Sequence, residues 1–287
     1  MNFLLIQEKG RHLANQEFRE ALNLSRALKK LGHKSVVWGL NYDNFNIPFE
    51  ELEDKCDVII LLENYEINGW IPDLSKSKKF KIFWSIDSHC VPQQHVDTCN
   101  KHKIQLVLCA IEHHQTYFKK QQTIWFPNAY PDDLIYPISG IEKKYDIGFC
   151  GNYLNRKNWV DLIKSKYKLR EDIFVIGNDM VKAINSFKIH FNRNLADDIN
   201  FRTFETLGCK TMLLTNHTPG LEKLFNTDEH LVVYKSENDL LDKINYYIKN
   251  QTELEKISNQ GYNHVLDNHT YFVRAQQLTD LLQEILY

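Results

Sequence analysis

Two adjacent basic residues, Arg156 and Lys157, stand where an apolar segment gives way to a helical pattern. The stretch "DIGFCGNYLNRKNWVDLI" (146–163) is typical of a strand that ends at Gly151, followed by a polar loop and the start of a helix. Because a helix N-terminus offers N–H groups and a positive dipole end, two cations beside it strengthen an anion site. A solvated basic pair is the alternative. The sequence has no G-x-G-x-x-G or Walker A pattern, so neither dinucleotide nor P-loop chemistry is favoured.

A dense polar stretch follows the apolar segment "FKIHFN" (187–192), and Glu205 lies inside the helix predicted next. A mere turn does not need this density of polar side chains, which therefore indicates a ligand site. Taken alone, Glu205 fits an ordinary exposed helix glutamate. The polar residues of the stretch are Asn192, Arg193, Asn194, Asp197, Asp198, Asn200 and Arg202.

A third turn, "TNHTPGLEKLF" (215–225), predicts another open helix N-terminus, with Pro219 at the first helical position between Thr218 and Gly220. Glu222 would lie near the positive end of that helix. Helix capping alone also explains this turn. Together with the other two, it would place three anion-binding turns on one rim.

A parallel sheet would bring these turns together at one edge, and the alternation of strands and helices along the chain predicts two such sheets. Short apolar runs alternate with amphipathic stretches, such as the helix predicted within 15–33 and closed by Gly32. Residues 236–287 predict helices only, and 126–144, with three prolines and a glycine, indicates a linker. We therefore predict an α/β fold with two doubly wound domains and ligands beyond the carboxyl ends of the strands. The predicted strands are 3–6, 35–39, 57–62, 81–86, 106–110, 123–126, 145–151, 172–177, 187–192, 210–215 and 230–234.

The composition is that of a soluble globular protein, with 287 residues, 43% apolar and 25% charged. The formal net charge of -2 gives no global attraction to nucleic acid or to an anionic membrane. The first apolar run is too short for a signal peptide or a membrane span. Six scattered cysteines are typical of reduced, buried thiols, so we expect a cytoplasmic protein.

One spacing is compatible with a metal site. His95, Cys99 and His102 fall at positions i, i+4 and i+7 of a predicted helix. The helix is otherwise polar and the chain is rich in histidine, so we predict no metal site. Metal binding by these three residues is kept as an alternative.

The second half of the chain resembles a known family. "INFRTFETLGCKTMLLTNHTPGLEKLF", "HLVVYKSENDLLDKINYYI" and "GYNHVLDNHTYFVRAQQL" are similar to group 1 glycosyltransferases with the GT-B fold, and in particular to their CgeB-like branch. The resemblance covers about residues 123–285 and includes "WFPNAYPDDLIYP", which is similar to the family's interdomain segment. Residues 1–122 match only in general architecture.

The resemblance implies two Rossmann-like domains facing across a cleft, with a C-terminal helix crossing back to the N-terminal domain. The expected boundaries are 1–130 for acceptor binding, 131–144 for the linker, 145–268 for donor binding and 269–287 for the returning helix.

The resemblance also implies a donor site. Glu205 is similar to the later glutamate of an E-x7-E motif, which takes the ribose hydroxyls of a nucleotide. Asp197, eight positions earlier, stands where the first glutamate would hold the donor sugar, and this is a departure because aspartate is shorter. Arg156 and Lys157 would bind the diphosphate, and Arg202 would add a cation. The other expected donor-binding residues are Gly151, Asn200 and Thr218 with Gly220 and Leu221, whose backbone N–H groups would face the donor.

The N-terminal half offers weaker candidates for a catalytic group. In "FWSIDSHC" (83–90), Asp87 and His89 follow a predicted strand, where either could accept the proton of an acceptor hydroxyl. A capping aspartate with an incidental histidine is the alternative. The loop "QEKGRH" (7–12) would bring further charged side chains to the same rim.

The function implied is transfer of a sugar from a UDP- or GDP-sugar to an acceptor hydroxyl, with retention and without an obligatory metal or a tightly bound cofactor. Three alternatives stay open: a GT-B epimerase or hydrolase acting on a nucleotide sugar, a non-catalytic sugar-nucleotide or glycan-binding module, and a transferase whose acceptor is DNA instead of a glycan, protein or lipid.

Overall fold

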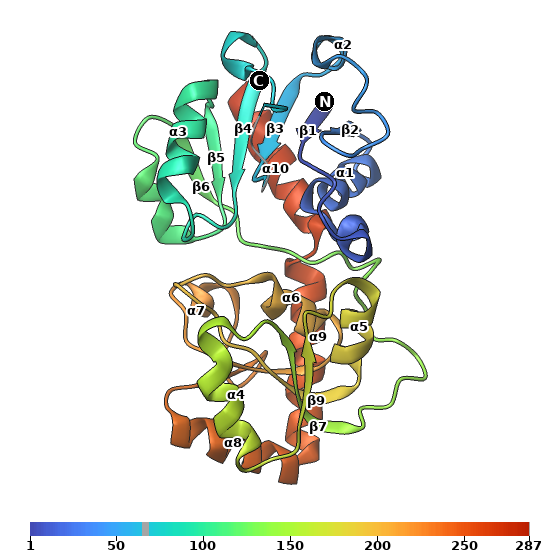
Figure 1. Ribbon diagram of the computed structural model, residues 1–287, viewed down its shortest axis with the longest axis vertical. Helices are drawn as coiled ribbons and strands as arrows, with labels where there is room; N and C mark the ends of the chain where they lie inside the picture. The colour runs from blue at the N-terminus through green and yellow to red at the C-terminus, as the bar shows by residue number, and fades with distance from the viewer. Residues whose placement is uncertain (65–68, 287) are drawn as a thin grey trace. The chain divides into compact units, whose positions relative to one another are not determined.

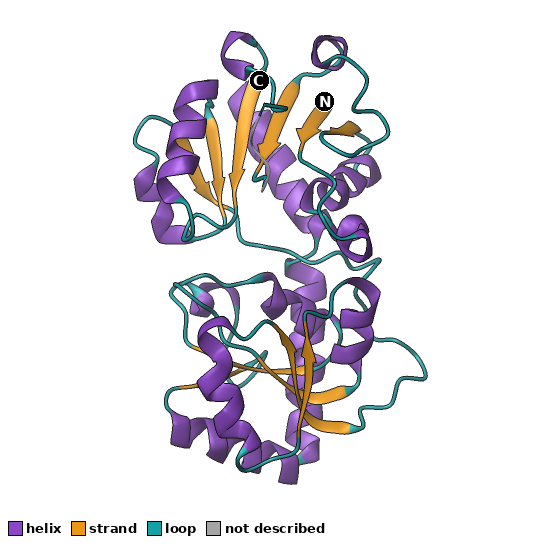
Figure 2. Ribbon diagram, viewed as in Figure 1, coloured by secondary structure: helices purple, strands orange, loops and turns teal. Residues whose placement is uncertain are grey.

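The computed structural model describes residues 1–64 and 69–286. The chain divides into two compact units, each built around its own parallel sheet (Figures 1 and 2). Unit 1 consists of Met1–Pro127 together with Tyr271–Tyr287, and unit 2 consists of Asn128–Thr270.

Unit 1 contains a six-stranded sheet in the order β2-β1-β3-β4-β5-β6, with every neighbouring pair parallel. Its strands are β1 (Asn2–Ile6), β2 (Lys34–Trp38), β3 (Val58–Leu62), β4 (Phe80–Ser85), β5 (Leu106–Cys109) and β6 (Gln122–Trp125). Its helices are α1 (Glu20–Lys30), α2 (Phe49–Asp54), α3 (Pro92–His102) and α10 (Tyr271–Leu286), with short 3-10 turns at Leu13–Phe18, Leu74–Lys76 and Glu112–Tyr117.

Both faces of the unit 1 sheet are covered, which explains why β3, "VIILL", is buried at every position. Along β4, Phe83 packs in a cluster that includes Cys99 of α3. The next side chain, Trp84, contacts Tyr271 of α10, with ring centroids 6.3 Å apart. Successive side chains of a strand point to opposite faces, so α3 and α10 cover different faces.

The C-terminal helix α10 belongs to unit 1, as expected from the resemblance. In Figure 1 it lies, in red, beside the strands of the first sheet, and its buried Arg274 donates from Nε to the carbonyl of Pro127 at 2.8 Å. Its apolar face, with Ala275, Leu278 and Leu282, is fully buried.

The predicted glycine cap of α1 is also present. Gly32 has φ +84°, and its N–H donates to Lys29 while the N–H of His33 donates to Leu28, each at 3.0 Å. These two bonds form a Schellman motif, which requires a left-handed residue at the position that Gly32 occupies.

Unit 2 contains a five-stranded parallel sheet in the order β11-β10-β9-β7-β8. Its strands are β7 (Tyr145–Gly151), β8 (Leu169–Ile173), β9 (Phe187–Phe191), β10 (Met212–Asn216) and β11 (Val232–Tyr234). Its helices are α4 (Lys157–Lys164), α5 (Gly177–Asn185), α6 (Phe201–Gly208), α7 (Leu221–Leu224), α8 (Glu237–Lys249) and α9 (Gln251–Asn268), with a 3-10 turn at Leu154–Arg156.

One strand lies at other residues than predicted. The apolar run 172–177 was expected to be a strand, but β8 is Leu169–Ile173 and Gly177 already begins α5. β8 lies at the edge of the sheet beside β7 only, so its sequence "LREDI" is more polar than that of a central strand. Phe174, with φ +55°, ends the strand just before the apolar residues that misled the prediction.

No helix among residues 1–64 and 69–286 is long and apolar enough to cross a membrane. Five cysteines are buried and reduced, whereas Cys90 is exposed.

Candidate functional site

The three polar turns singled out from the sequence follow β7, β9 and β10 of unit 2. These strands are neighbours in one parallel sheet, so their carboxyl ends share one edge and the turns lie together there. This edge, with the start of α4 and of α6, is called the unit 2 rim below.

Arg156 is held at the rim by backbone carbonyls. It is the N-cap residue of α4, and its Nε donates to the carbonyl of Arg193 at 2.7 Å while Nη1 donates to that of Asn152 at 3.3 Å. Burial lowers the pKa of Arg156, and the charge of Arg202 lowers it further, whereas Asp198 opposes the shift. Two guanidinium groups from different turns therefore lie close enough to repel each other.

A third arginine adjoins them. The guanidinium carbon of Arg193 lies 4.5 Å from the ring centroid of Trp159, and its Nη1 donates to the hydroxyl of Tyr234 at 3.3 Å. Its charge also lowers the pKa of Arg156. Arg193 was noted in the sequence only as part of the polar stretch, and its place beside Trp159 depends on packing that spacing does not reveal.

Lys157 turns away from this group of arginines. It is exposed, forms an ion pair with Asp161 one turn along α4 and lies over the ring of Tyr153, 5.2 Å from its centroid. The sequence pair thus separates into a half-buried arginine and an outward-facing lysine.

Glu205 forms an ion pair with Arg202 on the same helix. Oε2 of Glu205 lies 2.8 Å from Nη1 of Arg202, and the two side chains are only 15% and 18% exposed. Arg202 also contacts the sulfur of Met180. Glu205 is therefore a shielded carboxylate with a fixed cation, not an exposed helix glutamate.

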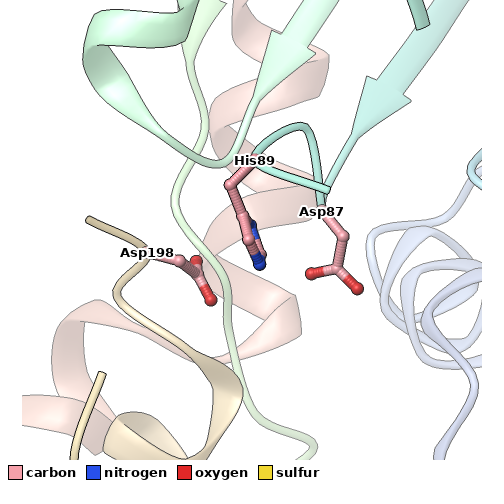
Figure 3. A group of neighbouring side chains, drawn as sticks. All are labelled: Asp87, His89 and Asp198. Atoms are coloured by element: carbon pink, nitrogen blue, oxygen red, sulfur yellow. The ribbon is translucent and has the colours of Figure 1, made fainter. Parts of the chain in front are cut away.

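The two adjacent aspartates before α6 differ in environment. Asp197 is exposed and has φ +62°, following Ala196 with φ +49°. Asp198, drawn in Figure 3, is buried, and its charge raises the pKa of Arg156. The spacing of the E-x7-E motif, counted back from Glu205, had pointed to Asp197 as the residue that holds the donor sugar. Two consecutive left-handed residues change the direction of the chain here, and the sequence contains no signal for them because neither is glycine.

A buried asparagine joins two of the turns. Asn194 donates from its backbone N–H to Oδ1 of Asn216 at 2.7 Å and from Nδ2 to the hydroxyl of Thr218 at 3.0 Å. Its Oδ1 accepts from Nδ2 of Asn192 at 3.1 Å and from the backbone N–H of Asn200, the N-cap of α6, at 3.4 Å. The start of α6 and the turn after β10 are therefore parts of one hydrogen-bonded network.

The turn at Thr218 corrects a prediction. The N–H of Leu221 donates to the carbonyl of Thr218 at 3.0 Å, with Pro219 in the second position and Gly220 at φ +86°, ψ −9° in the third, which is a type II turn. Pro219 was expected at the first helical position, but α7 begins at Leu221. The N–H of Leu221, expected to face the donor, is bonded within the turn.

Gly151 ends β7. A Cβ atom there would meet nothing nearer than the ring of Phe149 at 3.6 Å, so the chain leaves space beside it.

In unit 1, Asp87 and His89 lie on the loop directly after β4 (Figure 3). Burial raises the pKa of Asp87, and the charge of His89 opposes this rise. The N–H of Asp87 donates to Oε2 of Glu63 at 2.7 Å. Glu63, which follows β3, was not selected from the sequence, although an acidic residue directly after a buried strand is a usable signal.

The two histidines of the possible metal pattern have other partners. Nδ1 of His95 is 2.8 Å from the hydroxyl of Ser85, and Nε2 is 3.4 Å from Glu63. Nδ1 of His102 accepts from the N–H of Leu74 at 3.2 Å. Burial raises the pKa of Cys99. These contacts fit core packing of α3.

Two doubly wound parallel sheets in one chain, with the last helix returning to the first unit, define a two-domain α/β protein of the GT-B type. Solved structures agree with this assignment. A sucrose-phosphate synthase from Thermosynechococcus elongatus is 10% identical, with a TM-score of 0.68 and 99% of each chain covered. At a sequence identity this low, the similarity shows the fold alone.

Two further structures have the same fold. The Anabaena protein HepE, solved in complex with UDP-glucose, is 12% identical with a TM-score of 0.65, over 99% of this chain and 100% of that chain. An alpha-glucosyltransferase, solved with UDP and a 13-mer DNA containing a HMU base, is 9% identical with a TM-score of 0.70, over 99% of each chain.

The family model described as "Glycosyl transferase-like" matches residues 133–280, which is more than half of the chain. The protein therefore belongs to this family and is a glycosyltransferase. A search of the curated proteins gave no match. Membership of the CgeB-like branch stays a prediction.

Proposed function

We propose that unit 2 binds the diphosphate of a UDP-sugar and that the protein transfers the sugar, with retention, to an acceptor hydroxyl. The observation that carries this proposal is the group of arginines at the unit 2 rim. Arg156, Arg193 and Arg202 come from three segments, and burial together with the charges of Arg202 and Arg193 lowers the pKa of Arg156. Cations held together in a partly buried place are stabilised by an anion of opposite charge.

A departing nucleoside diphosphate develops negative charge as the bond to the sugar breaks. Fixed cations that face this charge stabilise the transition state, because they need no reorganisation during the reaction. Arg156 fits the requirement, since two backbone carbonyls fix its guanidinium. Lys157, which pairs with Asp161, contributes mainly to the surrounding potential.

Glu205 is the proposed ligand of the ribose hydroxyls. Its carboxylate forms an ion pair with Arg202, and an ionised carboxylate only accepts hydrogen bonds and so suits a pair of hydroxyl donors. The hydrogen bonds of Asn194 hold Asn200 and the turn at Thr218 in place around the donor sugar. We propose that Asp198, the buried carboxylate near Arg156, contacts the donor sugar, the role that the resemblance implied for Asp197.

Unit 1 is proposed to supply the acceptor side, with Asp87 and His89 next to the reacting hydroxyl. The choice of UDP follows the structures of HepE with UDP-glucose and of the alpha-glucosyltransferase with UDP. The second of these contains DNA, so a DNA hydroxyl is included among the acceptors to be tested.

The test is the thermal stabilisation of the protein by UDP. We expect saturating UDP to raise the melting temperature of the parent, because a ligand at about 100 times its Kd adds roughly 2.7 kcal/mol of stability. Arg156→Ala and Glu205→Ala should lose most of this shift. Lys166→Ala, which removes an exposed cation beyond α4, is the matched control and should keep it. Equal shifts in all four proteins would refute the proposed donor site.

A further inference from the structure

Glu63 is the central acceptor of a buried polar network in unit 1. Its Oε2 accepts the backbone N–H of Ile86 at 3.1 Å and that of Asp87 at 2.7 Å. Its side chain is only 14% exposed. One carboxylate oxygen thus fixes two successive peptide groups at the start of the loop that carries Asp87 and His89.

The same oxygen is supported from α3. Nε2 of His95 lies 3.4 Å from it, and Nδ1 of His95 is 2.8 Å from the hydroxyl of Ser85, the last residue of β4. Burial lowers the pKa of His95 to about 4, so the ring is neutral at physiological pH. The neutral ring that fits both contacts has its proton on Nε2, facing Glu63, and accepts from Ser85 on Nδ1.

The backbone of Glu63 is held as well. Nε2 of Gln7 donates to its carbonyl at 3.2 Å and to Oε2 of Glu20 at 2.8 Å, which connects the ends of β1 and β3 with α1. The backbone of Glu63 is therefore held by Gln7, separately from the bonds that its side chain makes to the loop 86–89.

We propose that Glu63 is a positioning residue for sugar transfer: its ionised carboxylate holds the backbone of Ile86 and Asp87 so that the loop presents its side chains to the acceptor in one fixed arrangement. This inference rests on the proposed function, in which that loop forms the acceptor side. Glu63 acts through the backbone of the loop, so it is not itself a catalytic residue.

The charge of Glu63 is sensitive to pH near neutrality. Burial, together with the negative charges of Asp87 and Glu20, raises its pKa to about 7, although the two N–H bonds oppose the rise. Among the described residues, the titratable groups that act on it are Asp87 on the loop after β4, Glu20 on α1 and the neutral His95 on α3. Above pH 7 the carboxylate is ionised and binds both N–H groups strongly; below pH 7 it is protonated and these bonds weaken.

The test compares Glu63→Gln, which keeps an acceptor oxygen without the charge, with Glu63→Ala, which removes both. Glu50→Gln, an exposed position on α2, is the matched control. The probe is UDP release from UDP-glucose in the presence of a free hexose, an alkyl glucoside or a DNA duplex containing a HMU base as acceptor.

We expect Glu63→Ala to lower kcat/KM for the acceptor by roughly tenfold to a hundredfold, the range for losing charge-assisted hydrogen bonds, with an unchanged KM for UDP-glucose. The parent rate should rise as the pH increases through about 7, because ionised Glu63 is the active form. Glu63→Gln should give an intermediate rate and lose this rise.

Hydrogen exchange at the amides of Ile86 and Asp87 tests the inference without any turnover. Exchange should be faster in Glu63→Ala, intermediate in Glu63→Gln and unchanged in Glu50→Gln. Parental exchange at both amides in Glu63→Ala, or an unaltered pH profile in Glu63→Gln, would overturn the inference. If the parent neither binds UDP nor releases it while exchange changes as expected, the donor assignment fails and the positioning of the loop stands.

Discussion

Asn194 links several segments of the unit 2 rim by hydrogen bonds. It is 4% exposed, and its hydrogen bonds reach the turns after β9 and β10. A buried amide with several partners is costly to remove, because each partner loses its bond without regaining water.

We predict that Asn194→Ala destabilises the protein by about 2–3 kcal/mol, since at least the hydroxyl of Thr218 and Nδ2 of Asn192 lose a partner. Urea denaturation measures this loss. Asn245→Ala, at an exposed position of α8, is the control and should change stability by less than about 0.5 kcal/mol. A loss no larger in Asn194→Ala than in the control would show that the network contributes nothing.

For individual residues, the sequence indicated candidate side chains for the site better than it indicated which of them are buried. Arg202 and Glu205 were selected from the family resemblance, and Arg156 both from the resemblance and from its place at a helix start. Asp198 is buried and Asp197 exposed because the backbone is left-handed at two residues before Asp198. Glu63 is buried because segments after β1 and β4 and the helix α3 pack around it. Neither is determined by spacing along the chain.

Among the elements, α9 packs closely against α6 and against the segment before β11. A Cβ atom at Gly261 would lie 2.2 Å from the backbone oxygen of His230 and 2.9 Å from a methyl group of Leu207. The first contact is with backbone, which moves only if the segment before β11 shifts.

We predict that Gly261→Ala destabilises the protein by about 1–3 kcal/mol, the usual cost of overpacking. Helix propensity alone predicts the opposite sign, because alanine is favoured over glycine by about 1 kcal/mol in a helix interior. Asn263→Ala, exposed on the same helix, isolates the propensity effect and should be neutral or slightly stabilising. A Gly261→Ala variant that melts above the parent would show that α9 can move away from α6 and from the segment before β11.

Most strands could be predicted because buried parallel strands are continuous apolar runs with recognisable ends. The edge strand β8 was misplaced because it is half exposed and is followed by apolar residues. The start of α7 was misplaced by two residues because proline suits both the first helical position and the second position of a type II turn.

At the scale of the whole molecule, the GT-B fold could be predicted from the long pattern in residues 123–285 and from the alternation of strands and helices. The return of α10 to unit 1 was expected only from the resemblance, since an amphipathic helix does not indicate which sheet it covers. Family membership establishes glycosyl transfer, and the unit 2 rim supplies the argument for a nucleoside diphosphate donor.

The most direct test of the central claim is the reaction of UDP-glucose with the acceptor panel, followed by UDP release and by NMR of the anomeric proton of the product. We predict that UDP release requires an acceptor and that the new glycoside is α-linked, as in the donor. Arg156→Ala should lower kcat by roughly a hundredfold or more, the scale on which fixed electrostatic groups act. UDP release at the full rate without acceptor, or an Arg156→Ala variant as active as Lys166→Ala, would contradict the account.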